Sequence, residues 1–135
     1  MTDNLSKARR SANMRAVRSQ DTRPEICVRQ VAHALGYRFR LHRSELPGKP
    51  DIVFIGKRKA IFVHGCFWHQ HKGCKRASMP QSNVNFWRIK LTRNVTRDAD
   101  QLRSLKAVGW TALVVWECET KDKIKLAKRL SRFLK

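Results

Sequence analysis

Cysteine and histidine residues are concentrated in one short stretch of the chain, residues 64–74. This stretch holds two thiols and three imidazoles, and one more thiol follows a later apolar segment: His64, Cys66, His69, His71, Cys74 and then Cys118. Because tetrahedral zinc takes four sulfur or nitrogen ligands and short loops cost little entropy to close, the spacing predicts a closed zinc site. Three cysteines would be joined there by one histidine, and both His69 and His71 have a suitable spacing. The competing interpretation is a set of reduced cysteines beside solvated histidines.

A single carboxylate, Asp51, stands where a predicted strand begins. It follows the turn sequence Pro-Gly-Lys-Pro at residues 47–50 and precedes an apolar run. A carboxylate in this position has no packing role, whereas Mg2+ takes one or two carboxylates together with phosphate oxygens. Asp51 is therefore predicted to bind Mg2+. The alternative is that it only caps the turn.

A second acidic residue lies on a long helix predicted over residues 84–108. Asn94 and Asp98 are four residues apart, so they share one face of this helix. Asp98 falls within the apolar stripe and should point inward, where a carboxylate needs a partner such as an imidazole. The alternative is a structural ion pair with Arg38 or with a residue beside Arg97.

Aromatic residues accompany these candidates. Phe67 and Trp68 lie in the Cys/His-rich stretch, and Phe86 and Trp87 begin the long helix. Aromatic side chains among lysines and arginines stack on bases or insert between base pairs. Trp87 also fits the apolar stripe of the helix, so the sequence allows it equally to be a core residue.

Three helices are predicted from caps and periodicity. A capping box of Thr22 and Glu25 begins a helix that ends at Gly36. The long helix follows, and a basic amphipathic helix over residues 122–134 completes the chain. The stripe of the long helix is Val84, Trp87, Leu91, Val95, Leu102 and Leu105. Cys27, within the first helix, is expected to be a small core or boundary residue.

Four strands are predicted between the helices. Residues 37–41 alternate strictly, and residues 51–55, 60–63 and 110–116 form apolar runs, with 51–55 and 60–63 joined as a hairpin. The order of helix, three strands, helix, strand and helix predicts an α/β fold with a small mixed sheet.

The 135 residues suit one domain, predicted over residues 21–135, preceded by a basic DNA-binding arm over residues 1–20. Thirty Lys and Arg against ten Asp and Glu give a formal net charge of +20. Such a charge calls for a polyanionic partner, with nucleic acid favoured over an acidic membrane surface. The chain begins without a secretory signal and has no apolar run near the ~20 residues of a membrane span, so a cytoplasmic protein is expected.

Four segments are similar to the very short patch repair (Vsr-type) DNA mismatch endonucleases. They are Asn-Met-Arg-Ala at residues 13–16, Leu-Pro-Gly-Lys-Pro-Asp at 46–51, Ile-Phe-Val-His-Gly-Cys-Phe-Trp-His at 61–69 and Val-Val-Trp-Glu-Cys at 114–118. The resemblance is colinear from Ser11 to Cys118. It implies a restriction-endonuclease-like, three-layer fold with a structural zinc, and an enzyme that nicks one strand 5′ of the thymine in a T:G mismatch. Such mismatches arise when 5-methylcytosine deaminates.

The resemblance also implies roles for individual residues in catalysis. Asp51 would bind the catalytic Mg2+ with the main-chain carbonyl of Val63, and His69 would be the general base for the attacking water. His64, oriented by Asp98, would lie near the scissile phosphate. A further acidic residue of the site is Glu25.

Other roles concern zinc and DNA. The resemblance gives the zinc ligands as Cys66, His71, Cys74 and Cys118, which favours His71 over His69. It gives the residues that enter the duplex as Phe67, Trp68 and Trp87, with the arm around Met14 approaching from the other side. The expected partners are duplex DNA with a T:G mismatch, other mismatch-repair proteins and a repair polymerase, and the expected state is a monomer.

The chain departs from the family pattern in three places. Val63 stands where other members often carry a hydroxyl residue, and the loop before Cys74 is one residue longer than in some relatives. The second acid and lysine usual in restriction-like nucleases are absent after Asp51, which favours histidine as the proton acceptor. Two other functions stay open: a restriction-type nuclease that cuts paired DNA, and a noncatalytic zinc protein that binds nucleic acid.

Overall fold

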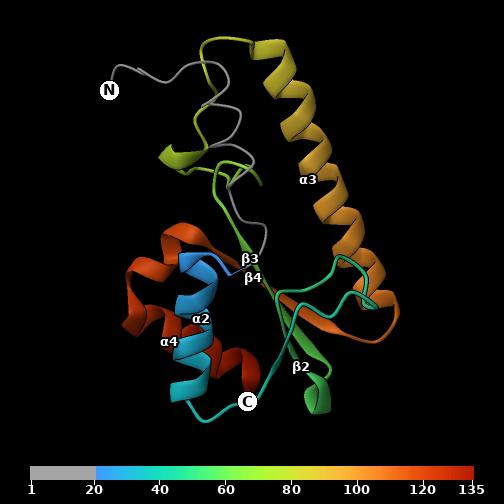
Figure 1. The fold of residues 1–135 in the computed structure, drawn as a ribbon, viewed down its shortest axis with the longest axis vertical. Coiled ribbons are helices and arrows are strands. Elements are labelled where there is room, and N and C mark those ends of the chain that lie inside the picture. The colour runs from blue at the N-terminus through green and yellow to red at the C-terminus, as the bar shows by residue number, and fades with distance from the viewer. Residues whose placement is uncertain (1–20) are drawn as a thin grey trace.

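The structure is a computed structural model that describes residues 21–135 (Figure 1). Its helices and strands are, in order, α2 (Arg23–Ala34), β1 (Arg40–Leu41), β2 (Ile52–Phe54), β3 (Lys59–His64), α3 (Val84–Ala107), β4 (Thr111–Trp116) and α4 (Lys123–Leu134). Three short 3-10 helices, η1 (Ile55–Lys57), η2 (Lys75–Ala77) and η3 (Glu117–Lys121), fill turns between them. The predicted arm over residues 1–20, with Met14, lies outside the described residues. No helix within residues 21–135 has the length and apolar character needed to cross a membrane.

The four strands form one sheet in the order β1-β2-β3-β4. The first two pairs are antiparallel, and β3 pairs with β4 in parallel, so the predicted α/β fold with a small mixed sheet is confirmed. The strand predicted over residues 37–41 is shorter than expected, because only Arg40 and Leu41 pair with β2. Tyr37 and Phe39 instead place their rings edge-on against Phe54.

The sheet is the middle of three layers (Figure 1). One face packs against α2 and α4 through buried residues: Val28, Ala32, Ile52, Phe54, Ile61, Val115, Leu126, Leu130 and Leu134. The other face packs against α3 and the segment before β2, around Val53, Ala60, Phe62 and Leu105. Because side chains alternate along a strand, β2 and β3 supply residues to both cores.

Helix α3 is longer than the sheet that it covers. Its 24 residues span roughly 36 Å at 1.5 Å per residue, whereas the six-residue strands β3 and β4 span roughly 20 Å. Leu91 and Leu105 are buried as predicted, but Val95 is 44% exposed and its predicted place in the buried stripe is wrong. The N-terminal half of α3 therefore projects beyond the sheet (Figure 1), with Phe86 and Ile89 also exposed.

Candidate active site and metal centre

A cleft of about 860 Å3 lies between the turn before β2, the end of β3 and one side of α3. It is lined by five residues that the sequence singled out: Asp51, Val63, His64, His69 and Asp98. Gly48 lets the turn approach closely, since a Cβ atom there would lie 3.0 Å from side-chain atoms of Phe62 and Gln101. Its φ of +79° is also one that residues other than glycine rarely adopt.

Asp51 is the residue just before β2, and its side chain lines the cleft. Its Oδ2 accepts a hydrogen bond of 2.7 Å from the Val63 amide, and its own amide donates to the Ile61 carbonyl. Burial, with the nearby Glu25 carboxyl as a further cause, raises the pKa of Asp51 to about 7. Ionising Asp51 in this buried position is costly, and a cation bound to its carboxylate would offset that cost.

Two stacked histidines lie beside Asp98 in the cleft. His69 Nδ1 lies 2.5 Å from Asp98 Oδ2, and the His64 ring stacks on the His69 ring with centroids 3.9 Å apart. The predicted imidazole partner of Asp98 is therefore present, and the hydrogen bond that the structure gives to Asp98 is from His69, whereas the resemblance assigned Asp98 to His64. His64 ends β3, whereas His69 follows a turn that brings its ring against Asp98 of α3, and ligand atoms of all three residues lie within 4.8 Å of one another.

The surroundings set the charge state of His64, and Asp98 sets the direction of the His69 ring. Burial, together with the neighbouring His69, lowers the pKa of His64 to about 4, so His64 is neutral near pH 7. The Asp98 carboxylate accepts from His69 Nδ1, and this leaves Nε2 as the nitrogen that can take up a proton. Asn94 fixes the loop nearby, donating a 3.0 Å hydrogen bond to the Trp68 carbonyl.

Glu25 lies behind the cleft and is only 2% exposed. Thr22 caps α2 as predicted, but the Glu25 carboxylate accepts from the Asp21 amide at 3.0 Å. It also contacts Arg29, which is one helical turn away, and His42 Nε2 at 2.9 Å. Sequence reasoning missed both partners. The i,i+4 spacing of Glu25 and Arg29 was a usable signal, whereas His42 is brought close by the pairing of β1 with β2.

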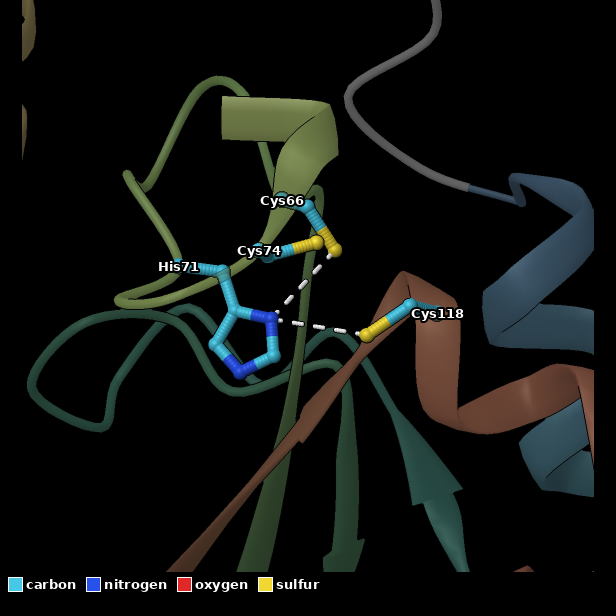
Figure 2. A group of neighbouring side chains, drawn as sticks. All are labelled: Cys66, His71, Cys74 and Cys118. Atoms are coloured by element: carbon cyan, nitrogen blue, oxygen red, sulfur yellow. Dashed lines mark hydrogen bonds between the residues drawn. The ribbon is translucent and has the colours of Figure 1, made fainter. Parts of the chain in front are cut away.

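A second group lies at the end of β3 and β4: Cys66, His71, Cys74 and Cys118 (Figure 2). One ligand atom from each lies within 4.8 Å of the others. His71 Nδ1 is 3.7 Å from the Cys66 sulfur and 3.4 Å from the Cys118 sulfur. Tetrahedral bonds of about 2.3 Å to sulfur and 2.0 Å to nitrogen place such atoms about 3.5 Å apart, so the four residues fit a zinc ion.

The local environment of the thiols agrees with a structural metal centre. Burial raises the pKa of Cys66 to about 12, whereas the Arg76 amide and neighbouring thiols lower the pKa of Cys74. A bound cation would convert the buried Cys66 thiol to the thiolate. The His71 ring stacks on Trp116 at 4.2 Å, which fixes its direction. Cys27 is half-buried near the Thr120 carbonyl and lies outside this group, as expected.

The aromatic residues form a cluster at the projecting half of α3. Ring centroids are 5.1 Å apart for Phe67 and Trp68, 5.5 Å for Phe67 and Trp87 and 5.8 Å for Trp68 and Trp87. Trp87 therefore packs with the loop aromatics and not in either core of the sheet. Phe86 is 58% exposed beside it, and Lys90 Nζ lies 5.7 Å from the Trp68 ring. The cluster combines an apolar surface with positive charge.

Comparison with known proteins identifies relatives along the whole chain. The family model described as DNA mismatch endonuclease Vsr matches residues 2–76. The Type II nicking enzyme V.XorIIP of Xanthomonas oryzae pv. oryzae is 50% identical over 99% of this chain and 98% of its own length. The Type II nicking enzyme V.NmeAIP of Neisseria meningitidis is 38% identical over 100% and 96%, respectively. The DNA mismatch endonuclease Vsr of Escherichia coli K12 is 40% identical over 93% of this chain and 80% of its own length.

Proposed function

The chain belongs to the Vsr family of DNA mismatch endonucleases, and we propose that it nicks one strand of duplex DNA 5′ of the thymine in a T:G mismatch. This reaction would begin the repair of deaminated 5-methylcytosine. The observation that carries the proposal is the cleft in which Asp51 lies beside a His69–Asp98 pair. Phosphodiester hydrolysis needs both a site for a cation and a base for water, and this cleft offers one of each.

His69 is proposed as the general base. Asp98 holds the ring through Nδ1, so Nε2 is directed to accept the proton of the attacking water. The carboxylate also stabilises the imidazolium that forms as the proton arrives. The neutral His64 ring, stacked on His69, supports the orientation of His69 and lies where it can donate to or accept from a phosphate oxygen.

Asp51 is proposed to hold Mg2+ with the main-chain carbonyl of Val63. The high pKa of Asp51 fits this role, since a divalent ion offsets the cost of a partly buried carboxylate. When bound, Mg2+ supplies positive charge to the phosphate oxygens during attack. The nearby Glu25 carboxyl contributes to the raised pKa of Asp51.

Zinc is proposed as the ion of the Cys66, His71, Cys74 and Cys118 group, with a structural role. All four positions of a tetrahedral ion would be filled by protein atoms, which leaves none for water or substrate. The ion would fasten the loop that carries Phe67, Trp68 and His69 to the end of β4. Both the base and the aromatic cluster therefore depend on it for their position.

The aromatic cluster is proposed to enter the duplex beside the mismatch. Insertion of aromatic side chains costs a few kcal/mol of base unstacking, and least where the pair is mismatched. Phe67, Trp68 and Trp87 are half-buried against one another and sit at the projecting end of α3. The +20 charge and the arm around Met14 would add affinity for the backbone. The layered α/β architecture supports a restriction-endonuclease-like fold, whereas a monomer acting in the cytoplasm stays a prediction of the sequence.

A strand-resolved nicking assay tests this function. Each strand of a duplex is end-labelled in turn, with a T:G pair placed in several sequence contexts and a fully paired duplex as control. The expected result is a single Mg2+-dependent break 5′ of the mismatched thymine. Cleavage of both strands of paired DNA would instead indicate a restriction-type nuclease, and binding without cleavage would indicate a noncatalytic zinc protein.

A further inference from the structure

A row of positive charges near the end of the chain lies outside both the cleft and the metal centre. It consists of Lys121, the last residue of η3, and Lys125, Lys128 and Arg132 of α4. All four side chains are exposed, and their spacings are four, three and four residues. Side chains at these spacings are neighbours on one face of a helix. We call these four residues the basic stripe.

The opposite face of α4 attaches the helix to the protein. Leu126, Leu130 and Leu134 are at most 2% exposed and pack into the core between α2 and the sheet. At about 100° per residue, the stripe residues of α4 lie on the side of the helix away from these leucines. Because the apolar face is buried, it is not available to enter a membrane surface, so a dissolved polyanion fits the basic stripe better.

The acidic side chains beside the basic stripe have other partners. Glu119 contacts Arg129, which also donates a 3.0 Å hydrogen bond to the Val114 carbonyl and so fastens α4 to β4. Asp122 caps α4 by accepting a 3.1 Å hydrogen bond from the Lys125 amide. Within residues 21–135, neither acid forms an ion pair with a residue of the basic stripe. The charges of the basic stripe are therefore available to a ligand.

A groove of about 630 Å3 runs between η3 and α4 beside the basic stripe. Lys125, Lys128 and Arg132 line it, together with Arg129. Successive cations of the basic stripe are roughly 5 Å apart along the helix, at 1.5 Å per residue. Each strand of duplex DNA carries one negative charge per 3.4 Å of its axis, so a row of cations with this spacing can follow a phosphate backbone.

The basic stripe and the cleft lie on opposite sides of the sheet. Helix α4 covers one face of the sheet with α2, whereas α3, which lines the cleft, covers the other (Figure 1). Because the basic stripe points away from the buried leucines, it also points away from the sheet. A straight duplex held in the cleft therefore does not run along the basic stripe.

We propose that the basic stripe binds the phosphate backbone of a second DNA duplex while the first occupies the cleft. Lysine and arginine contacts to phosphates carry no sequence information, so the second duplex can have any sequence. Holding two duplexes lets the protein pass from one DNA segment to another without release into solution. The inference rests on the proposed function only in that DNA is the ligand of the cleft.

Capture of a second duplex tests the proposal without any measurement of nicking. A duplex with one T:G pair is fixed to beads and loaded, without Mg2+, with less than one zinc-bound full chain per duplex. After washing, a fluorescent paired duplex is added at several salt concentrations. The wild type should retain this second duplex. The triple variant Lys125→Gln, Lys128→Gln, Arg132→Gln should retain it only at low salt, while it still binds the fixed duplex.

The salt dependence gives the size of the effect. Each phosphate contact adds about one to the slope of log affinity against log salt concentration, so the triple variant should lower the slope for the second duplex by about three. If circular dichroism shows that the triple variant does not fold, the double variant Lys125→Gln, Lys128→Gln is measured, with an expected fall of about two.

A matched control removes the same charge elsewhere. Arg40→Gln, Lys57→Gln and Lys106→Gln change three exposed cations on β1, η1 and α3. This control variant should capture the second duplex as the wild type does. Both triple variants should nick a T:G duplex with Mg2+ at the wild-type rate, which also shows that they are folded.

Several results would overturn the inference. One is a wild type that captures no second duplex, and another is equal capture by the wild type and the stripe variant, which would leave the basic stripe to an acidic protein. Equal losses in the stripe and control variants would indicate total charge alone, and weaker binding of the fixed duplex by the stripe variant would place the basic stripe on the first duplex. A wild type that captures a second duplex but nicks no DNA would overturn only the proposed function.

Discussion

Replacing Asp51 with asparagine should make the protein more stable while abolishing nicking. The oxygen of the introduced amide can still accept from the Val63 amide, and the uncharged amide group imitates the protonated acid beside the Glu25 carboxyl. What it removes is the cost of ionising a partly buried carboxylate. The variant should therefore separate the catalytic use of the charge from its effect on folding.

The size and sign follow from the pKa of Asp51, which is raised from 3.8 to about 7. The unfolded chain loses this proton near pH 4 and the folded protein near pH 7, so the folded state binds more protons in between. Wild-type stability due to this group therefore falls as pH rises through that window. At about 1.4 kcal/mol per pKa unit, the advantage of the variant should grow by about 2–3 kcal/mol between pH 5 and pH 8.

The assay is urea denaturation of the zinc-loaded protein at several pH values without added Mg2+. Asp100→Asn, an exposed change on α3, is the matched control and should show no such growth with pH. Added Mg2+ should stabilise the wild type alone, because it binds the folded state through Asp51. A difference between variant and wild type that stays constant with pH, or a destabilised variant, would refute the reasoning.

Three further changes probe the other parts of the site. Cys74→Ala should lose bound zinc and lower the melting temperature, measured by metal analysis and thermal unfolding; Cys27→Ala, outside the cluster, should keep its zinc, and a zinc-free but equally stable Cys74 variant would count against a structural ion. Asp98→Asn should slow single-turnover nicking by about 10²–10⁴-fold while DNA binding is retained, because His69 loses the partner that orients it. An unchanged rate would exclude His69, oriented by Asp98, as the general base. Trp68→Ala should reduce the preference for mismatched over paired duplex more than it reduces overall affinity, measured by competition binding, and equal losses on both duplexes would contradict insertion.

Much of the fold was accessible because the local signals agree with the tertiary structure. The Thr22 cap predicts the start of α2, and the apolar run before Trp116 predicts β4 within one residue. The strand predicted over residues 37–41 is only partly present, because alternating hydrophobicity indicates a buried face but not whether the backbone pairs with a neighbouring strand. Val95 was misplaced because periodicity cannot show where a helix outruns its sheet.

The candidate site was predictable in its residue types but not in its pairings. The Cys/His spacing led to the four-residue group, and the inward position of Asp98 led to an imidazole partner. Whether His69 or His64 meets Asp98 depends on how the loop after β3 turns back to α3, and the sequence does not show this. No sequence motif includes Arg29 and His42. Both contact Glu25 only because β1 pairs with β2 and α2 packs beside these strands.

The cleft is proposed to break DNA at a T:G mismatch by using Asp51. The most direct test is the single-turnover rate of nicking for one duplex carrying either T:G or T:A at the same position, with saturating enzyme and with or without Mg2+. We expect rapid nicking of the T:G duplex with Mg2+ and no detectable break in the other three reactions. Equal rates on the two duplexes, or nicking that persists in Asp51→Asn, would contradict it.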